Sequence, residues 1–249
     1  MANTDVETVI VTGANGEIGR SICKKIMLSG RDVVAITRSA TDFSEIKQTE
    51  SSIQNVVVPD IADLVAIGKV FANLNAKGVN LGGLVSGAAI FNRFESLDEM
   101  TTERWAEIFR INVIAPFLWA KTYAAWCEIY ESSGSIINIA SQAAFTGGFG
   151  GVIPYAASKG ALISTTKGLA RELAPKNIRV NSIAPGFIET EAMNGNLDTE
   201  KLKAFYLRVP MGRFGTVDEV ADVVVFLLSE ASNYITGSTI DITGGQLMH

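Results

Sequence analysis

A tyrosine and a lysine stand four residues apart in the stretch YAASK, at Tyr155 and Lys159. On a helix this spacing places both side chains on one face, within reach of each other. Pro154 suits the start of such a helix. A tyrosine with its ordinary pKa of about 10 is a poor base at neutral pH, but a neighbouring ammonium group stabilises the phenolate and lowers that pKa. The pair is therefore a candidate for proton transfer.

The same spacing also occurs on solvated helix faces that have no catalytic role, so a second signal is needed. The stretch SIINIAS has the pattern of a buried strand and ends at Ser141. In an open α/β sheet, ligands bind beyond the carboxyl ends of the strands, and we expect the Ser141 hydroxyl to emerge at that edge. Ser141, Tyr155 and Lys159 are therefore the candidate catalytic residues.

A second candidate site is the turn at residues 11–20, with the sequence VTGANGEIGR, where a strand passes into a helix. The free N–H groups and positive dipole end of that helix attract phosphate. Gly13 permits a tight turn, Gly16 removes a Cβ where a ligand approaches, and Gly19 lets the helix lie close to the strand. An ordinary strand–turn–helix connection uses the same residues, so the rest of the chain must decide between it and a nucleotide site.

Glu17 places an acid in this turn. We expect its backbone N–H to contact a phosphate while its side chain points into solvent, because the helix dipole tolerates a carboxylate in the first turn. This interpretation gives the glycines the ligand role and the Glu17 side chain none.

Seven short β-branched runs predict strands, and stretches with helical periodicity lie between them. The strands are expected at residues 8–11, 32–37, 53–58, 82–87, 135–140, 178–183 and 238–243. Continuous apolar strands indicate burial on both faces, which favours a parallel sheet with helices on either side. We therefore expect a single α/β domain over residues 1–249.

The composition of the 249-residue chain narrows the function classes. Hydrophobic residues make up 47% and charged residues 19%, and the net charge of -5 offers no basic surface for nucleic acid. No apolar run reaches membrane-spanning length and the N-terminus lacks the plan of a signal peptide, so we expect a cytoplasmic protein with no membrane partner. The only histidine is His249, so neither a Cys/His metal site nor a Ser/His/Asp triad is expected. Cys23 and Cys127 are expected to be buried, reduced thiols.

Six stretches, in order, resemble the short-chain dehydrogenase/reductase family in its compact single-domain branch. They are TGANGEIG, RIN at 110–112, NIAS at 138–141, YAASK at 155–159, NIRVNSIAPGFIET at 177–190 and TGSTIDITGG at 236–245. The resemblance implies a Rossmann-type, doubly wound α/β fold. It also implies that Ser141 hydrogen-bonds the substrate oxygen, that Tyr155 exchanges its proton, and that Lys159 holds the nicotinamide ribose while lowering the tyrosine pKa. Asn112 completes the tetrad of the family.

The position of a proline supports Asn112 independently. Pro116 has no N–H, so the carbonyl of Asn112, four residues earlier, loses its helical partner and the helix should kink there. A freed carbonyl can hold a water, and in the family that water connects the lysine to solvent. An asparagine that only fills a helix kink is the alternative interpretation.

By resemblance, a nicotinamide cofactor lies along the sheet edge. Ile188 and Thr190 would fix the nicotinamide, and Asp60 would contact the adenine, although Asp60 could equally cap a helix that starts near Asp63. The predicted cofactor contacts are Gly13, Asn15, Gly16, Glu17, Ile18, Gly19, Arg38, Asp60, Ile61, Gly87, Ala88, Tyr155, Lys159, Pro185, Gly186, Ile188 and Thr190.

Two stretches depart from the family pattern. The compact branch usually has a glycine at the position of Glu17, whereas the glycine spacing here is that of the longer-chain, epimerase-like branch. LVSGAAI stands where NNAG is common, so residues 86–89 must support the cofactor without the asparagine side chains. Helix N–H groups and small residues remain, so a nucleotide is still expected.

The stretch AITRSA, at the end of the second expected strand, bears on the choice of dinucleotide. Thr37 stands where NAD-selective relatives carry an aspartate, and the guanidinium of Arg38 can bind a 2′-phosphate. The Glu17 carboxylate and the missing basic residue in the glycine turn argue for NAD, and Arg38 has a solvated surface arginine as its simpler interpretation. We predict NADP over NAD.

The predicted function is hydride transfer between a nicotinamide cofactor and a small-molecule carbonyl or secondary alcohol. The glycine spacing suggests a nucleotide-sugar epimerase or dehydratase as an alternative, but only about 60 residues follow Gly186, too few for a typical sugar-binding domain. A catalytically silent nucleotide-binding regulator is a third interpretation. The four candidate catalytic residues together argue against it.

The substrate pocket is expected to form from residues 142–153 and from a covering segment at about 187–213. Aromatic residues there also have ordinary packing as an interpretation. The candidate substrate contacts are Ser141, Gln142, Phe145, Phe149, Tyr155, Phe187, Met193, Phe205 and Tyr206.

The segments 103–131 and 154–174 carry apolar residues over much of their circumference, more than one sheet-facing stripe requires. Resemblance to the family implies helix-to-helix subunit contacts there. We therefore predict a homo-oligomer, a tetramer or a dimer.

Overall fold

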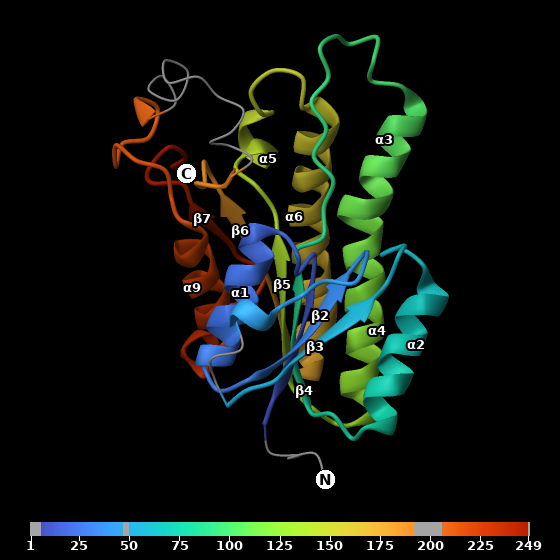
Figure 1. Cartoon of the computed structure of the whole chain (residues 1–249). Helices are drawn as coiled ribbons and strands as arrows, with labels where there is room; N and C mark the ends of the chain where they lie inside the picture. Colours follow the sequence, from blue (N-terminus) through green and yellow to red (C-terminus); the bar gives the residue numbers. More distant parts are fainter. Residues whose placement is uncertain (1–5, 47–49, 192–205, 249) are drawn as a thin grey trace.

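One parallel sheet organises the computed structural model, which describes residues 6–46, 50–191 and 206–248. Its seven strands lie in the order β3-β2-β1-β4-β5-β6-β7, between two layers of helices (Figure 1). They are β1 (Thr8–Thr12), β2 (Asp32–Thr37), β3 (Ile53–Val57), β4 (Leu81–Ser86), β5 (Gly134–Ile139), β6 (Ile178–Pro185) and β7 (Thr239–Ile242). The predicted doubly wound, seven-stranded parallel sheet is confirmed.

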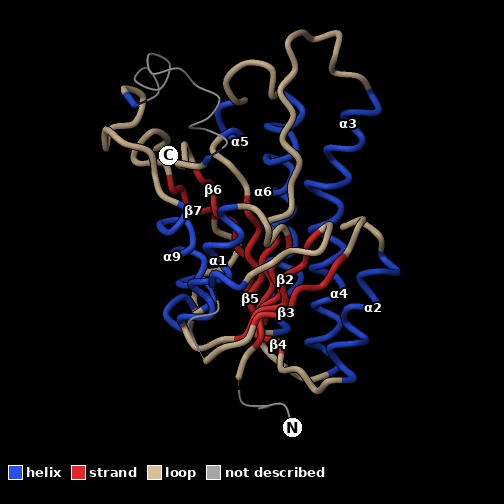
Figure 2. Tube along the Cα trace, in the orientation of Figure 1, coloured by secondary structure: helices blue, strands red, loops and turns tan. Residues whose placement is uncertain are grey.

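Helices cover both faces of the sheet (Figure 2). On one face lie α1 (Glu17–Leu28) and α9 (Val217–Leu228), and on the other lie α2 (Leu64–Ala76), α4 (Ala115–Ile129) and α6 (Ile153–Leu173). The described residues also form α3 (Thr102–Phe109) and the short α5 (Ala143–Thr146). Short 3₁₀ turns lie at Ser44–Ile46, Ala174–Lys176 and Glu230–Ser232.

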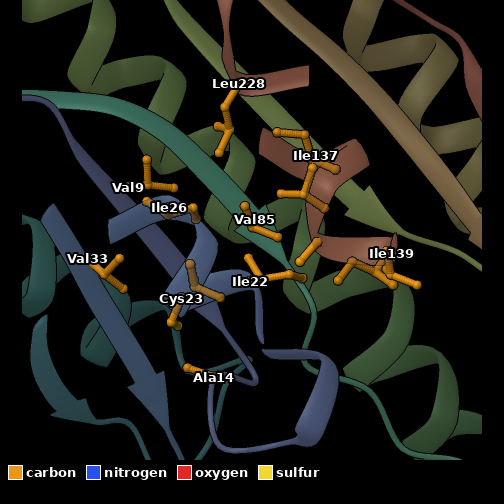
Figure 3. Packing of buried hydrophobic residues seen from close by; sticks show 14 of the residues in the cluster. Val9, Ala14, Ile22, Cys23, Ile26, Val33, Val85, Ile137, Ile139 and Leu228 are labelled. Carbon is orange, nitrogen blue, oxygen red and sulfur yellow. The ribbon is translucent and has the colours of Figure 1, made fainter. Parts of the chain in front are cut away.

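Apolar side chains pack tightly between α1 and the sheet (Figure 3). Ile22, Cys23 and Ile26 of α1 are fully buried against the strand residues Val9 and Val85. Both cysteines are free and buried, as predicted, and burial raises the pKa of the Cys23 thiol to about 12. Two buried hydrophobic clusters, one on each face, thus anchor the helices to the sheet.

The long helical stretch around Asn112 is not continuous. A π-helical turn, Arg110–Ile114, separates α3 from α4, and the Ala115 N–H donates to the Arg110 carbonyl. Pro116 has no N–H with which to close the regular α-helical bond to residue 112. The irregularity predicted from Pro116 therefore lies at the expected residue and takes the form of a π turn.

The strand order reverses between β1 and β4, which are neighbours in the sheet. From β1 the chain continues to β2 on one side of this pair, and from β4 it continues to β5 on the other side. Such a switch point leaves a crevice at the carboxyl edge. No helix among the described residues is long and apolar enough to span a membrane.

Candidate active site

The structure brings Ser141, Tyr155 and Lys159 together at the carboxyl edge of the sheet. Ser141 follows β5, and its hydroxyl is hydrogen-bonded to that of Tyr155 on α6. The Ala143 N–H donates to Ser141 Oγ at 3.1 Å, which orients this hydroxyl. One turn along α6, the Lys159 ammonium donates to the Ile139 carbonyl at 2.6 Å and lies 5.6 Å from the centroid of the Tyr155 ring.

The electrostatics of this group differ from expectation. Burial raises the pKa of Tyr155 above its ordinary value, and the hydrogen bond with Ser141 only partly offsets that effect. Burial also lowers the pKa of Lys159 to about 8. The expected lowering of the Tyr155 pKa by Lys159 is therefore wrong for the protein alone, where desolvation is the largest effect and the hydrogen bond with Ser141 is what opposes it. Tyr155 is a protonated phenol at neutral pH.

Asn112 lies in the π turn and is fully buried. Its Oδ1 accepts from the Ile90 N–H at 2.9 Å, and its Nδ2 donates to the Ile90 carbonyl and to Ser158 Oγ, each at 3.0 Å. Ser158 in turn donates to the Tyr155 carbonyl at 2.7 Å. The Asn112 side chain thus connects the segment after β4 to the helix that carries Tyr155.

The glycine turn forms an uncapped helix start. Gly16 is the N-cap of α1 and no side chain caps the N–H groups of the first turn. Gly13 has a φ of +69°, and a Cβ there would lie 2.6 Å from the Ala88 nitrogen, so only glycine fits. A Cβ on Gly19 would lie 2.3 Å from the Gly13 carbonyl oxygen. Free N–H groups facing open space suit a phosphate.

A cavity of about 520 Å³ extends from this turn along the switch point. Its size lies within the range of small-molecule and cofactor sites. It is lined in part by these predicted cofactor contacts: Gly13, Asn15, Gly16, Arg38, Asp60, Ile61, Gly87 and Ala88. These residues fit the adenosine half of a dinucleotide. Ile18, half-buried, follows in the first turn of α1.

The Glu17 side chain is exposed, as expected, but it also makes a contact that was not predicted. Its two carboxylate oxygens accept from the backbone N–H of Glu191, at 3.0 and 3.1 Å. The carboxylate therefore links the glycine turn to the chain that follows β6. Pattern reading missed this contact because the two residues lie 174 positions apart.

Asp60 does not cap a helix. Asp63 is the N-cap of α2 and accepts from the N–H groups of Val65 and Ala66. Asp60 pairs with Arg110, whose Nη1 lies 2.7 and 2.8 Å from its two carboxylate oxygens. The Arg110 guanidinium lowers the pKa of this carboxyl. Both side chains border the cavity.

Residues 86–89 keep their place without the family's asparagines because Thr12, the last residue of β1, supports them. Its hydroxyl accepts from the N–H groups of Gly87 and Ala88 at 3.1 and 3.3 Å, and its carbonyl also accepts from Gly87. Thr12 was not among the predicted site residues, although its place at the end of a central strand is a signal that could have found it.

At the end of β2, the two residues predicted to choose the dinucleotide differ in their surroundings. Thr37 is buried, and its hydroxyl donates to the Ser39 carbonyl and accepts from Asn55 Nδ2, both at 2.7 Å. Arg38 is exposed and borders the cavity.

The residues predicted to hold the nicotinamide follow β6. The Pro185 carbonyl accepts from the Gln142 N–H at 3.0 Å, and Gly186 donates to the Ile242 carbonyl at 2.9 Å. Ile188 is buried and bridges to Gly215, while Thr190 is half-buried. These contacts place the start of the segment at the same edge as Ser141.

Several of the aromatic residues predicted to contact substrate lie next to one another. Phe149 and Phe187 lie with ring centroids 5.8 Å apart, Phe187 contacts Phe214 at 5.6 Å, and Tyr206 stacks on Phe214 at 4.3 Å. Phe145 is exposed and Gln142 is buried. Met193 and Phe205 lie outside the described residues.

Phe91 is a neighbour of Tyr155 that was not predicted. Its ring meets that of Tyr155 edge-on, with centroids 5.0 Å apart, yet Phe91 is 61% exposed. A large apolar side chain left in contact with both solvent and Tyr155 is a candidate substrate contact. Its only signal in the sequence is its position shortly after a strand.

Comparisons with known proteins identify the family of the chain. A family model described as "Enoyl-(Acyl carrier protein) reductase" matches residues 13–246. The chain is 34% identical over 238 residues to L-xylulose reductase of Caenorhabditis elegans, covering 95% of this chain and 94% of that protein. It is 35% identical over 240 residues to 3-oxoacyl-[acyl-carrier-protein] reductase FabG of Aquifex aeolicus, covering 95% of each.

Among solved structures, ElxO with bound NADP superposes with a TM-score of 0.85 at 26% identity, over 97% of this chain and 98% of that one. The chain belongs to the short-chain dehydrogenase/reductase family and is a nicotinamide-dependent oxidoreductase acting on CH–OH and C=O groups.

Proposed function

We propose that the chain interconverts a carbonyl and an alcohol on a small molecule with NADP as its preferred dinucleotide, and that Asn112, Ser141, Tyr155 and Lys159 are its working residues. The observation that carries this proposal is the contact between the Ser141 and Tyr155 hydroxyls, beside Lys159, at the sheet edge that bears the uncapped glycine turn. When bound, the nicotinamide supplies or accepts the hydride.

The side chains supply the proton. Because burial keeps Tyr155 protonated, its hydroxyl donates a proton to the substrate oxygen during reduction. Ser141 hydrogen-bonds the same oxygen and keeps it within reach. The phenolate that remains on Tyr155 is stabilised by the Lys159 ammonium, which with a pKa of about 8 is still largely charged at neutral pH. Asn112 keeps the segment after β4 attached to α6.

Arg38 supports the preference for NADP. Its exposed guanidinium borders the cavity next to Thr37, whose hydroxyl is already engaged by Ser39 and Asn55. A charge-assisted pair with a 2′-phosphate is available there, whereas no carboxylate at position 37 receives the bare ribose of NAD.

Three further statements stay predictions. The segment at about 187–213 covers the substrate, next to the aromatic side chains of Phe149 and Phe187. The chain forms a homo-oligomer, which the exposed side chains of Ile114 and Phe117 along the α3–α4 region support. The protein is cytoplasmic.

The test is to incubate the protein with reduced cofactor and a panel of ketones while following cofactor fluorescence. Oxidation of the cofactor with at least one ketone is the expected result. Binding of the cofactor without turnover of any ketone or alcohol would instead favour a silent nucleotide-binding regulator. NADPH and NADH are compared in parallel, because the proposal expects the larger kcat/KM with NADPH.

A further inference from the structure

Glu17 occupies an unusual position for an acid. It is the first residue of α1, in a turn whose N–H groups lack any side-chain cap, and it stands where the family usually has a glycine. Its carboxylate accepts from the Glu191 N–H with both oxygens, at 3.0 and 3.1 Å. An anionic group already present in the protein thus lies on a donor beside the phosphate-binding turn.

The chain that presents this donor is held in place by backbone contacts. The Glu189 N–H donates to the Gly215 carbonyl at 2.8 Å, and the Gly215 N–H donates to the Phe187 carbonyl at 3.0 Å. Ile188, between them, is buried. These contacts hold the backbone two residues before Glu191, whose N–H points at the Glu17 carboxylate.

The uncapped N–H groups of α1 would bind a diphosphate at the glycine turn, and the Glu191 N–H, which lies within hydrogen-bond distance of the first side chain of α1, would be a second donor to it. An N–H whose hydrogen already points at the Glu17 carboxylate cannot also donate fully to a phosphate. The second anion would in addition lie close to the first, at an exposed site where salt only partly screens their repulsion.

We propose that Glu17 sets the affinity for the dinucleotide by acting as a built-in competitor of its diphosphate for the Glu191 N–H. This inference rests on the proposed function, since it presumes that a dinucleotide binds at the glycine turn. Loading of the cofactor exchanges one acceptor of this N–H for another, with no covalent step. The dinucleotide therefore binds more weakly than it would if position 17 held an uncharged residue.

The experiment measures the dissociation constant of NADPH by fluorescence titration in the intact chain. Glu17→Gln keeps the size of the side chain but removes its charge, and it should bind NADPH about 3- to 10-fold more tightly, the range expected for the net contribution of one ordinary hydrogen bond at an exposed site. Glu17→Asp keeps the charge but is shorter by about 1.5 Å, so it loses the contact. It should also bind more tightly than the parent.

Glu189→Gln is the matched control, because it removes a carboxylate from the same exposed segment without touching the contact. It should leave the dissociation constant unchanged. Glu191→Pro removes the N–H itself, so Glu17→Gln should tighten NADPH binding less in that background than in the parent, because only the charge repulsion is left to remove.

An unchanged or weaker affinity of Glu17→Gln would overturn the inference. So would a parental affinity of Glu17→Asp, or a gain in Glu189→Gln equal to that in Glu17→Gln, since both outcomes assign the effect to general charge. Failure of the parent itself to bind either dinucleotide would reject the proposed function together with this inference.

Discussion

Replacing the buried Lys159 tests the electrostatics of the site through protein stability. Lys159 is 3% exposed, and its pKa falls from 10.5 to about 8 through desolvation. The native state thus binds this proton less tightly than the unfolded chain does. Stability is reduced at low pH, where the folded protein must carry the buried charge, and is recovered as the pH rises through 8 towards 10.5.

The size of this effect follows from the two pKa values. Each pKa unit corresponds to about 1.4 kcal/mol, so the buried ammonium costs about 3 kcal/mol at pH 7 and about 1 kcal/mol at pH 10. Lys159→Met keeps a side chain of similar length but cannot titrate. It also loses the 2.6 Å hydrogen bond to the Ile139 carbonyl, so the absolute stabilities differ by less than this cost. The change with pH isolates the charge.

The assay is urea unfolding of the parent and of Lys159→Met at pH 7 and pH 10. The free energy of unfolding of the parent should rise relative to that of the variant by about 2 to 3 kcal/mol between the two pH values. Lys167→Met, an exposed lysine on the same helix, is the control and should show the pH dependence of the parent. Parallel pH dependences for the parent and Lys159→Met would refute the reasoning.

Three further predictions concern other parts of the molecule. Arg38→Ala should lower kcat/KM for NADPH by about tenfold or more and leave that for NADH nearly unchanged, and a parent that prefers NADH would contradict the interpretation of this residue. Asn112→Ala loses three hydrogen bonds of a fully buried side chain and should lower the free energy of unfolding by about 2 to 4 kcal/mol in urea titrations, whereas an unchanged midpoint would contradict its positioning role. Light scattering should give a mass of two or four chains for the parent and a smaller assembly for Phe117→Glu, and a monomeric parent would count against the proposed oligomer.

The sheet could be predicted from the sequence because strands that are buried on both faces need apolar residues at consecutive positions. Runs such as TVIV and DVVAIT are apolar at consecutive positions, as strands covered by helices must be, and they coincide with β1 and β2. The grouping of Ser141 with Tyr155 follows from the same logic, since residues that end parallel strands or begin the next helix meet at one edge.

Contacts between loops were beyond prediction. The bond from Glu17 to the Glu191 N–H and the contact of Phe91 with Tyr155 depend on the paths of connecting segments, which carry no periodic pattern. The Tyr155 pKa was misjudged for a related reason. The spacing to Lys159 shows which charge is near, but the opposing effect of desolvation depends on how deeply the whole fold buries the phenol.

The most direct test of the account is turnover in Tyr155→Phe, which removes one hydroxyl from the edge of the sheet. The variant should keep the parental fold by circular dichroism and the parental dissociation constant for NADPH, because the ring and its contact with Phe91 remain. Its kcat for the best ketone should fall by about a hundredfold or more, the usual cost of losing a general acid. Near-parental kcat in a variant that still binds NADPH would contradict the central claim that Tyr155 supplies the proton.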